Sequence, residues 1–259
     1  MLYNAQRASI CALQIVQLSD LHFGSLFVQS TFDAVVDEVN KLSPDAIVIT
    51  GDLTDEGLLF QFEKARTEFK RFTCPNIIVQ AGNHDYRHTG YLLFKKFFPS
   101  KQVYDLGQVL LLTLGTARPD RDEGEVGYRQ NLWVEKTLAR YPDKIKIVAM
   151  HHHLIGIPDT GTDKIIVLDA GDALRVCLQS KVDLVLCGHK HRPWLWKLGE
   201  LAIAYAGTAS SARFRGFFEN SYNIIEIQNN KVRVDIKIVG KKGFPLSELV
   251  ERYKPFLEQ

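Results

Sequence analysis

Four short motifs of polar residues contain side chains that could bind metal ions. They are Asp20-Leu21-His22, Gly51-Asp52, Gly82-Asn83-His84-Asp85 and Gly188-His189-Lys190-His191, and the run His151-His152-His153 adds further imidazoles. Carboxylate and amide oxygens mixed with imidazole nitrogens suit Mn, Fe, Zn or Co, whereas calcium sites are built from oxygen alone. The motifs therefore predict a site for two divalent or trivalent metal ions, which is suited to hydrolysis of a phosphate ester.

Two of the motifs place candidate ligands two residues apart. In an extended segment, side chains at positions i and i+2 point to the same side of the chain. Asp20 and His22 could therefore bind one ion, and His189 with His191 forms a second pair of this kind. Two such pairs in one chain favour a metal site over chance.

Asp52 and Asn83 are further candidate ligands, and each follows a glycine. Gly51 lets the backbone turn tightly beside the metals, and we expect the Asp52 carboxylate to bridge the two ions. The alternative for Asp52 is a loop aspartate that caps the next helix, and the alternative for Asn83 is a plain turn residue. Because the other motifs occur in the same chain, metal binding is the favoured interpretation for both residues.

The elements that must position these motifs can be predicted from the pattern of apolar residues. Short runs rich in β-branched residues are typical of strands buried on both faces, and helical spacing of apolar residues predicts helices between them. The predicted strands cover residues 13–18, 46–50, 77–81, 145–150 and 182–187, and the predicted helices cover about 29–41, 58–72, 90–97, 131–140 and 170–179. This alternation predicts parallel strands with right-handed crossovers, whose carboxyl ends would bring the motifs to one edge.

The remaining segments have a different character. Four strand-like runs after the last motif predict an antiparallel second half, in which Asn229-Asn230 suits a tight turn. The alternation of Trp194 and Trp196 places one of them at the surface or at a dimer contact. The four runs are 194–197, 201–206, 222–227 and 232–239, a hairpin-like insertion covers 103–105 and 109–114, and the ends are an N-terminal extension (1–12) and a C-terminal helix (245–259).

Composition and charge exclude several classes of protein. A chain of 259 residues that is 46% hydrophobic can build one large core, and without a linker or repeat we expect a single domain, 1–259. A net charge of +2 is too small for a nucleic-acid surface. No secretory leader or membrane-spanning run is found. The scattered cysteines (Cys11, Cys74, Cys177 and Cys187) are expected to be buried free thiols, which predicts a cytoplasmic protein.

Together the motifs resemble those of the calcineurin-like metallophosphoesterases. The likeness is greatest to the small bacterial and archaeal branch that contains class III cyclic nucleotide phosphodiesterases, and it covers residues 20–191 and the antiparallel run to about residue 240. The resemblance implies a mixed α/β fold. The expected architecture is a four-layer αββα sandwich of two mixed β-sheets flanked by helices, with both metals at one sheet edge.

The resemblance also implies the ligand set. Asp20, His22 and His191 would hold the first ion. Asn83, His151 and His189 would hold the second, and Asp52 would bridge the two. Within the histidine run the family ligand is the first residue after the strand, which is His151 here. His152 would then point partly away. His153 could line the substrate pocket or cover the loop, and covering the loop is favoured.

The implied activity is phosphodiester hydrolysis, of a cyclic nucleotide or another small diester. A metal-bridging hydroxide would attack phosphorus, and His84, oriented by Asp85 or a nearby carboxylate, would assist the leaving group; its alternative is a structural histidine. A phosphomonoesterase or a nucleotide pyrophosphatase on the same site is the nearest alternative. A nuclease or a non-catalytic scaffold is disfavoured, because the charge is near neutral and every ligand position is filled. We expect a small phosphoester as the substrate, no membrane partner, and a homodimer as the candidate assembly.

Several other polar residues have two interpretations. Arg87, Lys190, Arg213 and Arg215 could contact phosphate, but charged loop residues are usually solvated, and solvation is favoured for each. Arg87, Lys190 and His153 are the candidate substrate contacts. Asp55 could accept a hydrogen bond from a metal-binding histidine or cap the helix that begins near Leu58, and capping is slightly favoured.

Overall fold

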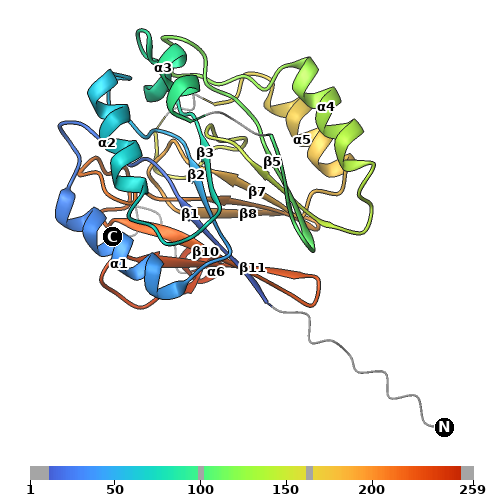
Figure 1. Ribbon diagram of the computed structural model, residues 1–259. Coiled ribbons are helices and arrows are strands. Elements are labelled where there is room, and N and C mark those ends of the chain that lie inside the picture. Colours follow the sequence, from blue (N-terminus) through green and yellow to red (C-terminus); the bar gives the residue numbers. More distant parts are fainter. Residues whose placement is uncertain (1–11, 99–101, 162–165, 252–259) are drawn as a thin grey trace.

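Two mixed β-sheets of six strands each lie face to face in the computed structural model, which describes residues 12–98, 102–161 and 166–251 (Figure 1). The first sheet has the order β12-β11-β10-β1-β2-β3, and the second has the order β4-β5-β6-β7-β9-β8. The strands are β1 (Leu13–Leu18), β2 (Ala46–Thr50), β3 (Ile77–Gln80), β4 (Val103–Leu106), β5 (Val109–Thr113), β6 (Ile145–Ala149), β7 (Leu184–Cys187), β8 (Trp194–Leu198), β9 (Leu201–Tyr205), β10 (Ser221–Gln228), β11 (Lys231–Ile238) and β12 (Phe244–Pro245).

Helices cover the outer faces of both sheets (Figure 1). Helices α1, α2 and α3 pack on the first sheet, and α4 and α5 pack on the second. The helices are α1 (Gln29–Leu42), α2 (Leu59–Phe69), α3 (Gly90–Phe97), α4 (Tyr128–Leu138), α5 (Ala170–Gln179) and α6 (Leu246–Glu251), and a short 3-10 helix spans His84–Tyr86. The predicted four-layer sandwich is confirmed.

Alternating side chains of the central strands explain why their sequences are apolar throughout. In β6, Ile147 belongs to the core between the two sheets, whereas Val148 belongs to the core beneath α4 and α5. In β2, Val48 and Ile49 divide in the same way between the inner core and the core beneath α1 and α2. Both faces of each strand are therefore buried, as the continuous apolar runs predicted.

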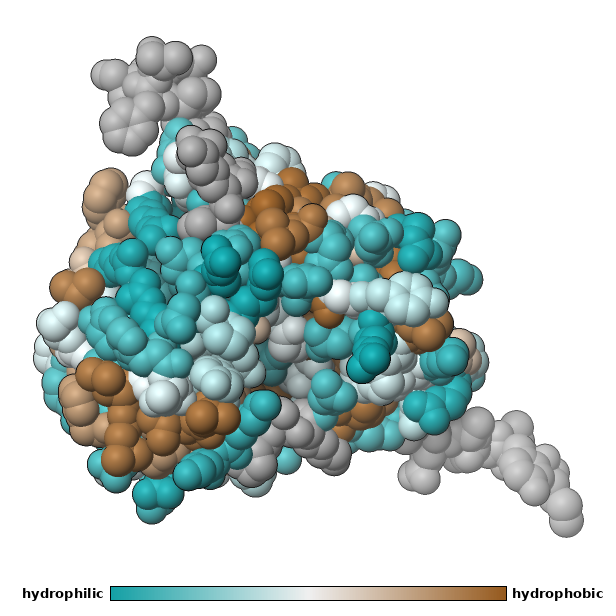
Figure 2. Space-filling view, turned by 90° about the horizontal axis from the view of Figure 1, so that it is seen from above, coloured by the Kyte–Doolittle hydropathy of each residue, from teal (hydrophilic) through white to brown (hydrophobic). Residues whose placement is uncertain are grey.

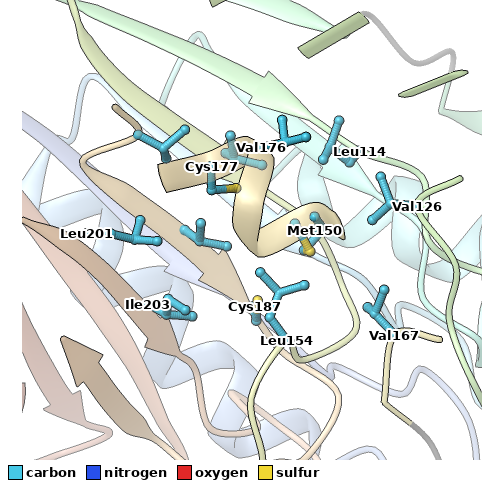
Figure 3. Packing of buried hydrophobic residues seen from close by; sticks show 14 of the residues in the cluster. Leu114, Val126, Met150, Leu154, Val167, Val176, Cys177, Cys187, Leu201 and Ile203 are labelled. Carbon is cyan, nitrogen blue, oxygen red and sulfur yellow. The ribbon is translucent and has the colours of Figure 1, made fainter. Parts of the chain in front are cut away.

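The core beneath α4 and α5 is a closely packed apolar cluster (Figure 3). Val176 and Cys177 of α5 belong to the same cluster as Met150, which follows β6, and Cys187, the last residue of β7. Three cysteines in the described residues, Cys74, Cys177 and Cys187, are buried and free, as predicted. Cys11 lies outside the described residues.

The second half of the chain differs from the simple antiparallel arrangement that was predicted. β8 pairs antiparallel with β9, and β10 pairs antiparallel with β11, but β9 pairs parallel with β7. β10 crosses to the first sheet and pairs antiparallel with β1. The late strands therefore extend both sheets, with β9 beside β7 in the second sheet and β10 beside β1 in the first.

The two chain ends and the two tryptophans also bear on the predictions. Only the beginning of the predicted C-terminal helix, α6, lies in the described residues, and of the N-terminal extension only residue 12 does. Trp194 is buried, whereas Trp196 is half-buried with its indole N–H donating to the Gly156 carbonyl, so Trp196 is the more exposed of the two.

The surface combines hydrophilic areas with separate hydrophobic patches (Figure 2). Among the residues that the structure describes, Phe60, Tyr128 and Phe218 are the most exposed large hydrophobic side chains. No helix in this part of the chain has the length and apolar character that crossing a bilayer requires.

Candidate metal centre

All the predicted metal ligands follow strands whose carboxyl ends meet at one edge of the sandwich. Asp20 and His22 follow β1, Asp52 follows β2, and Asn83 follows β3 of the first sheet; His151 follows β6, and His189 with His191 follows β7 of the second. All seven side chains are buried. The chain order β-α-β places residues more than a hundred positions apart within hydrogen-bond distance.

The first group of ligands consists of Asp20, His22 and His191. The Nε2 atoms of His22 and His191 lie 3.0 Å apart, and Nε2 of His191 lies 3.3 Å from Oδ1 of Asp20. The Asp20 carboxylate also accepts the backbone N–H of His189 at 3.0 Å, which ties the first motif to the fourth. These contacts form one candidate metal position.

The second group consists of Asn83, His151 and His189. Oδ1 of Asn83 lies 3.1 Å from Nε2 of His151 and 2.9 Å from Nδ1 of His189. The two imidazole nitrogens are 3.2 Å apart. The amide oxygen faces the histidines because the Asn83 amide N–H₂ donates to Asp122 at 3.0 Å.

Asp52 lies between the two groups. Its Oδ2 is 3.4 Å from Nε2 of His151 and 3.8 Å from Nε2 of His22. Its Oδ1 accepts the backbone N–H of His84 at 2.9 Å, which fixes the orientation of the carboxylate. This position is the one that a carboxylate shared by two metal ions would take.

The hydrogen bonds around the first group fit a bound cation. Nδ1 of His191 is 2.5 Å from the Arg213 carbonyl, so this nitrogen must carry the proton that it donates. Nδ1 of His22 faces the Asp55 carboxylate at 3.4 Å, which favours the proton there too. When each ring carries its proton on Nδ1 alone, the lone pairs of the two Nε2 atoms face each other at 3.0 Å. A cation between them would remove this repulsion.

The electrostatics of the buried groups lead to the same conclusion. Burial lowers the pKa of His22 to about 4 and holds that of His189 well below its usual range. Burial would also lower the pKa of His151, but the Asp52 carboxylate raises it to about 9. Burial opposes ionisation of Asp52, but His151 and His84 hold its pKa well below its usual value. Without metals, a proton on His151 therefore balances the negative charge of the Asp52 carboxylate. A bound metal ion would replace that proton.

Five of the ligands have a left-handed backbone, which differs from the predicted extended i, i+2 pairs. The φ angles are 54° for Asp20, 50° for His22, 51° for Asp52, 74° for His189 and 52° for His191. Such angles cost non-glycine residues roughly 1–3 kcal/mol each and are concentrated at functional sites. The paired ligands do converge, but through tight loops after the strands.

Glycines allow these loops to approach one another. Gly51 has a φ angle of 95°, and a Cβ there would meet Nδ1 of His151 at 2.5 Å. A Cβ on Gly82 would clash with the Asp52 carboxylate. The glycine before Asp52 is therefore required for a tight turn, as predicted, and the glycine before Asn83 leaves room for the bridging carboxylate.

His84 lies beside the ligands, but Asp85 does not orient its ring. Nδ1 of His84 donates to the Asp55 carbonyl at 2.7 Å, so Nε2 faces the cavity. The Asp85 carboxylate instead accepts hydrogen bonds from the backbone N–H groups of Leu53, Thr54 and Gly82, at 2.8–3.1 Å, and from the Thr54 hydroxyl. Burial and the Asp52 charge raise the pKa of Asp85 to about 7, although the three backbone donors act to lower it. Asp85 thus connects the second and third motifs.

The expectation that Asp55 caps a helix was wrong. The N-cap of helix α2 is Leu58, and the Gln61 side chain accepts the backbone N–H of Leu58. Asp55 therefore takes no part in capping this helix. The Asp55 carboxylate faces Nδ1 of His22 at 3.4 Å and accepts the Ser25 hydroxyl at 3.0 Å. These contacts with His22 and Ser25 hold its pKa at about 2. Asp55 therefore orients a candidate ligand, the alternative that the sequence left open.

The structure separates the three adjacent histidines. His151 reaches both Asn83 and Asp52, as described above. Both ring nitrogens of His152 are engaged, by the Thr116 hydroxyl at 2.8 Å and the Asp122 carbonyl at 3.2 Å. His153 is buried, and its ring stacks on His189 with centroids 5.5 Å apart. His151 is thus the member of the run whose Nε2 faces both Asp52 and Asn83.

The four basic residues occupy different places. Lys190 is buried, and its ammonium lies 3.4 Å from the Thr160 carbonyl, so the expectation of a solvated side chain was wrong. Arg87, Arg213 and Arg215 line a small polar cavity. This cavity is also lined by Asp52, Asn83, His84, Asp122, His189 and His191. Asp122 was missed at the sequence level, because a single aspartate in a polar loop carries no signal of its partner.

Comparison with known proteins agrees with this geometry. A family model described as calcineurin-like phosphoesterase matches residues 13–193. A probable cyclic nucleotide phosphodiesterase of Synechococcus is 28% identical over 196 residues, covering 71% of this chain and 75% of the relative. The 3′,5′-cyclic adenosine monophosphate phosphodiesterase CpdA of Escherichia coli K12 is 26% identical over 196 residues, covering 70% of each chain.

The fold also matches solved structures at low sequence identity. Purple acid phosphatase PPD1 from yellow lupin superposes with a TM-score of 0.71 at 14% identity, over 91% of this chain and 53% of that one. The chain thus spans about half the length of the lupin enzyme. The family match covers most of the chain, and the His and Asp clusters of the family site are present. The chain therefore belongs to the calcineurin-like phosphoesterase family and is a metal-dependent phosphoesterase.

Proposed function

We propose that the protein hydrolyses small phosphodiesters at a site for two metal ions. The observation that carries the proposal is the position of Asp52, whose Oδ2 lies within 3.8 Å of a histidine of each ligand group. The names of the relatives from Synechococcus and Escherichia coli support a diester, and a cyclic nucleotide is the first compound to try. The single domain that we infer is supported by pairing of β10 with β1 across most of the chain.

The residues of the chain would divide the work as follows. Asp20, His22 and His191 would hold one ion, Asn83, His151 and His189 would hold the other, and Asp52 would contact both. When bound, two such ions neutralise charge on phosphoryl oxygens and acidify water for in-line attack. The mixed oxygen and nitrogen ligands favour Mn, Fe, Zn or Co.

His84 would act on the side of the leaving group. Its Nδ1 is fixed by the Asp55 carbonyl, so Nε2 points to the cavity. Nε2 also lies 3.1 Å from a guanidinium nitrogen of Arg213 and 3.3 Å from one of Arg87. A second proton, on Nε2, would let this ring donate to the departing oxygen. The role of Asp85 would be indirect, through the loop that carries His84.

Two further expectations stay predictions. A cytoplasmic location is supported by the three buried free cysteines, which suit a reducing compartment. A homodimer also stays a prediction, with the half-buried Trp196 as a candidate contact. Sedimentation of the purified protein would give the oligomeric state directly.

Comparing a diester with a monoester tests the proposed function. The metal-stripped protein, reconstituted separately with Mn²⁺, Zn²⁺ and Mg²⁺, should hydrolyse bis-p-nitrophenyl phosphate with a kcat/KM at least about tenfold above that for p-nitrophenyl phosphate, since a tenfold preference needs only about 1.4 kcal/mol. Cyclic AMP would be tried next. A preference for the monoester with every metal would replace the diesterase with a phosphatase.

A further inference from the structure

Arg192 is a buried arginine that directly follows His191, the last of the candidate ligands. It is not one of the three arginines that line the small polar cavity. A charged side chain is rarely buried unless it is paired and hydrogen-bonded, because the charge loses its hydration on burial. The partners of Arg192 therefore indicate what its burial stabilises.

The Arg192 guanidinium connects two other loops to the loop that carries it. Its Nη1 donates to the carbonyl of Gly216, in the segment between β9 and β10. Its Nη2 lies 3.6 Å from the carboxylate of Asp159, in the segment between β6 and α5. Its Cζ lies 5.7 Å from the centroid of the Trp194 ring. The loops that follow β6, β7 and β9 thus meet at one side chain.

Gly216 is suited to this contact because it has no side chain. Its φ angle is 62°, in the left-handed region that glycine tolerates best. A Cβ at this position would clash with Nη1 of Arg192 and would lie 2.9 Å from the carbonyl oxygen of Asp159. The three loops could therefore not close in this way around a larger residue.

The segment held by Arg192 also carries two of the arginines that line the cavity. The Arg213 carbonyl accepts the Nδ1 proton of His191 at 2.5 Å, and the Gly216 carbonyl accepts a proton of Arg192. Arg215, which is half-buried, lies between these two attachment points. Its backbone is thus fixed on both sides before any ligand binds, which lowers the entropic cost of ordering its side chain on an anion.

We propose that Arg192 is a positioning residue that holds residues 213–216, so that the guanidinium groups of Arg213 and Arg215 meet phosphoryl oxygens in a fixed arrangement. The proposal rests on the proposed function and identifies a residue that serves it without touching the substrate. A guanidinium group donates paired hydrogen bonds to phosphate oxygens only in a suitable orientation. Without Arg192 the segment must be ordered during binding, so affinity for the phosphoryl group should fall, whereas the chemical step should change little.

Hydrogen exchange in the metal-free protein tests whether Arg192 holds the segment. Arg192→Met keeps an apolar stem and removes the charge and the donors. Amides in peptides that cover residues 213–218 should then exchange at least about tenfold faster, because opening of the segment no longer breaks the contact with Gly216. Arg192→Lys keeps the charge and should recover part of the protection. Unchanged exchange in Arg192→Met would overturn the proposal.

The matched control for these variants is Arg233→Met. Arg233 is exposed and pairs with Asp235 at 2.8 Å, so it also loses an ion pair when it is replaced. Its substitution should leave both the exchange of residues 213–218 and the binding of phosphate as they are in the wild type.

Binding of inorganic phosphate to the Mn²⁺-loaded protein tests whether the held segment serves the site. Calorimetry should show a Kd about tenfold higher in Arg192→Met than in the wild type. The same substitution in a protein that carries Arg213→Gln and Arg215→Gln should raise the Kd less than about twofold, because groups that act as a unit are not additive. A tenfold effect in both backgrounds, or none in either, would overturn the proposal.

Gly216→Ala provides a second variant, which leaves Arg192 in place and displaces the segment. It should raise the Kd for phosphate about as much as Arg192→Met, and it supplies the result if Arg192→Met does not fold. A wild-type Kd in folded Gly216→Ala would contradict the proposal.

The exchange and phosphate measurements need no turnover, so they decide the proposal separately from the proposed function. With bis-p-nitrophenyl phosphate, KM should rise about tenfold in Arg192→Met, while kcat stays within about threefold of wild type. Absence of wild-type hydrolysis with every metal would reject the proposed function, and the exchange and phosphate results would still decide whether Arg192 positions the segment.

Discussion

Replacing Asp52 with asparagine should lower kcat for bis-p-nitrophenyl phosphate about a thousandfold or more. Asp52 is the only described carboxylate within reach of both ligand groups, at 3.4 Å from His151 and 3.8 Å from His22. Asparagine keeps the volume and can still accept the His84 backbone N–H, but it lacks the charge that holds two cations together. Loss of one ion removes several kcal/mol of transition-state stabilisation, and each 1.36 kcal/mol is tenfold in rate.

The matched control is Asp143→Asn, which removes an exposed carboxylate before β6, at the end of that strand opposite to His151. It should leave kcat within about twofold of wild type, since surface substitutions usually change little. Far-UV circular dichroism of the metal-free Asp52→Asn protein should match that of the wild type. Full activity of a folded Asp52→Asn protein at saturating metal would exclude Asp52 as the shared ligand.

Metal ions should raise the melting temperature of the metal-free protein by roughly 5–10 °C. A ligand present at a hundred times its Kd stabilises the folded state by about 2.7 kcal/mol, and for a domain of this size each kcal/mol corresponds to about 2–4 °C. The physical source is the pair of buried carboxylates, Asp20 and Asp52, together with facing imidazole nitrogens 3.0 Å apart. Chelation should reverse the shift and abolish turnover.

Calorimetric scans with Mn²⁺ and Zn²⁺ would measure this effect, with K⁺ at matched ionic strength as the control. The same additions should shift the Asp52→Asn protein much less, because its sites lack the shared charge. If the wild-type melting temperature stays unchanged at millimolar metal, the buried cluster has no useful affinity for these ions.

Most of the fold could be predicted because local patterns determine it. Apolar runs that need burial on both faces identified β1, β2, β3, β6 and β7, and amphipathic spacing identified the helices between them. The pairing of late strands could not be predicted, because sequence periodicity does not show which sheet edge a strand will reach. β9 thus joins β7 in parallel, and β10 joins β1 on the opposite sheet.

The candidate ligands could be predicted from residue type and spacing, whereas the residues around them could not. Asp55 and Asp85 lie thirty positions apart, and which one faces a ligand depends on how two loops pack. The Asp85 carboxylate accepts hydrogen bonds from the backbone N–H groups of residues 53 and 54, whereas the Asp55 carboxylate faces His22. Similarly, the position of Arg213 and Arg215 at the cavity becomes visible only when the segment after β9 lies against His191.

The most direct test of the two-metal account is a count of bound ions. Metal-free protein dialysed to equilibrium against Mn²⁺ or Zn²⁺, and analysed by plasma mass spectrometry, should bind two ions per chain, and Asp52→Asn should bind one or none at the same free concentration. Two ions in the wild type with a deficit in the variant would support a pair of sites joined by Asp52. One ion per wild-type chain at saturation, or an equal count in both proteins, would contradict it.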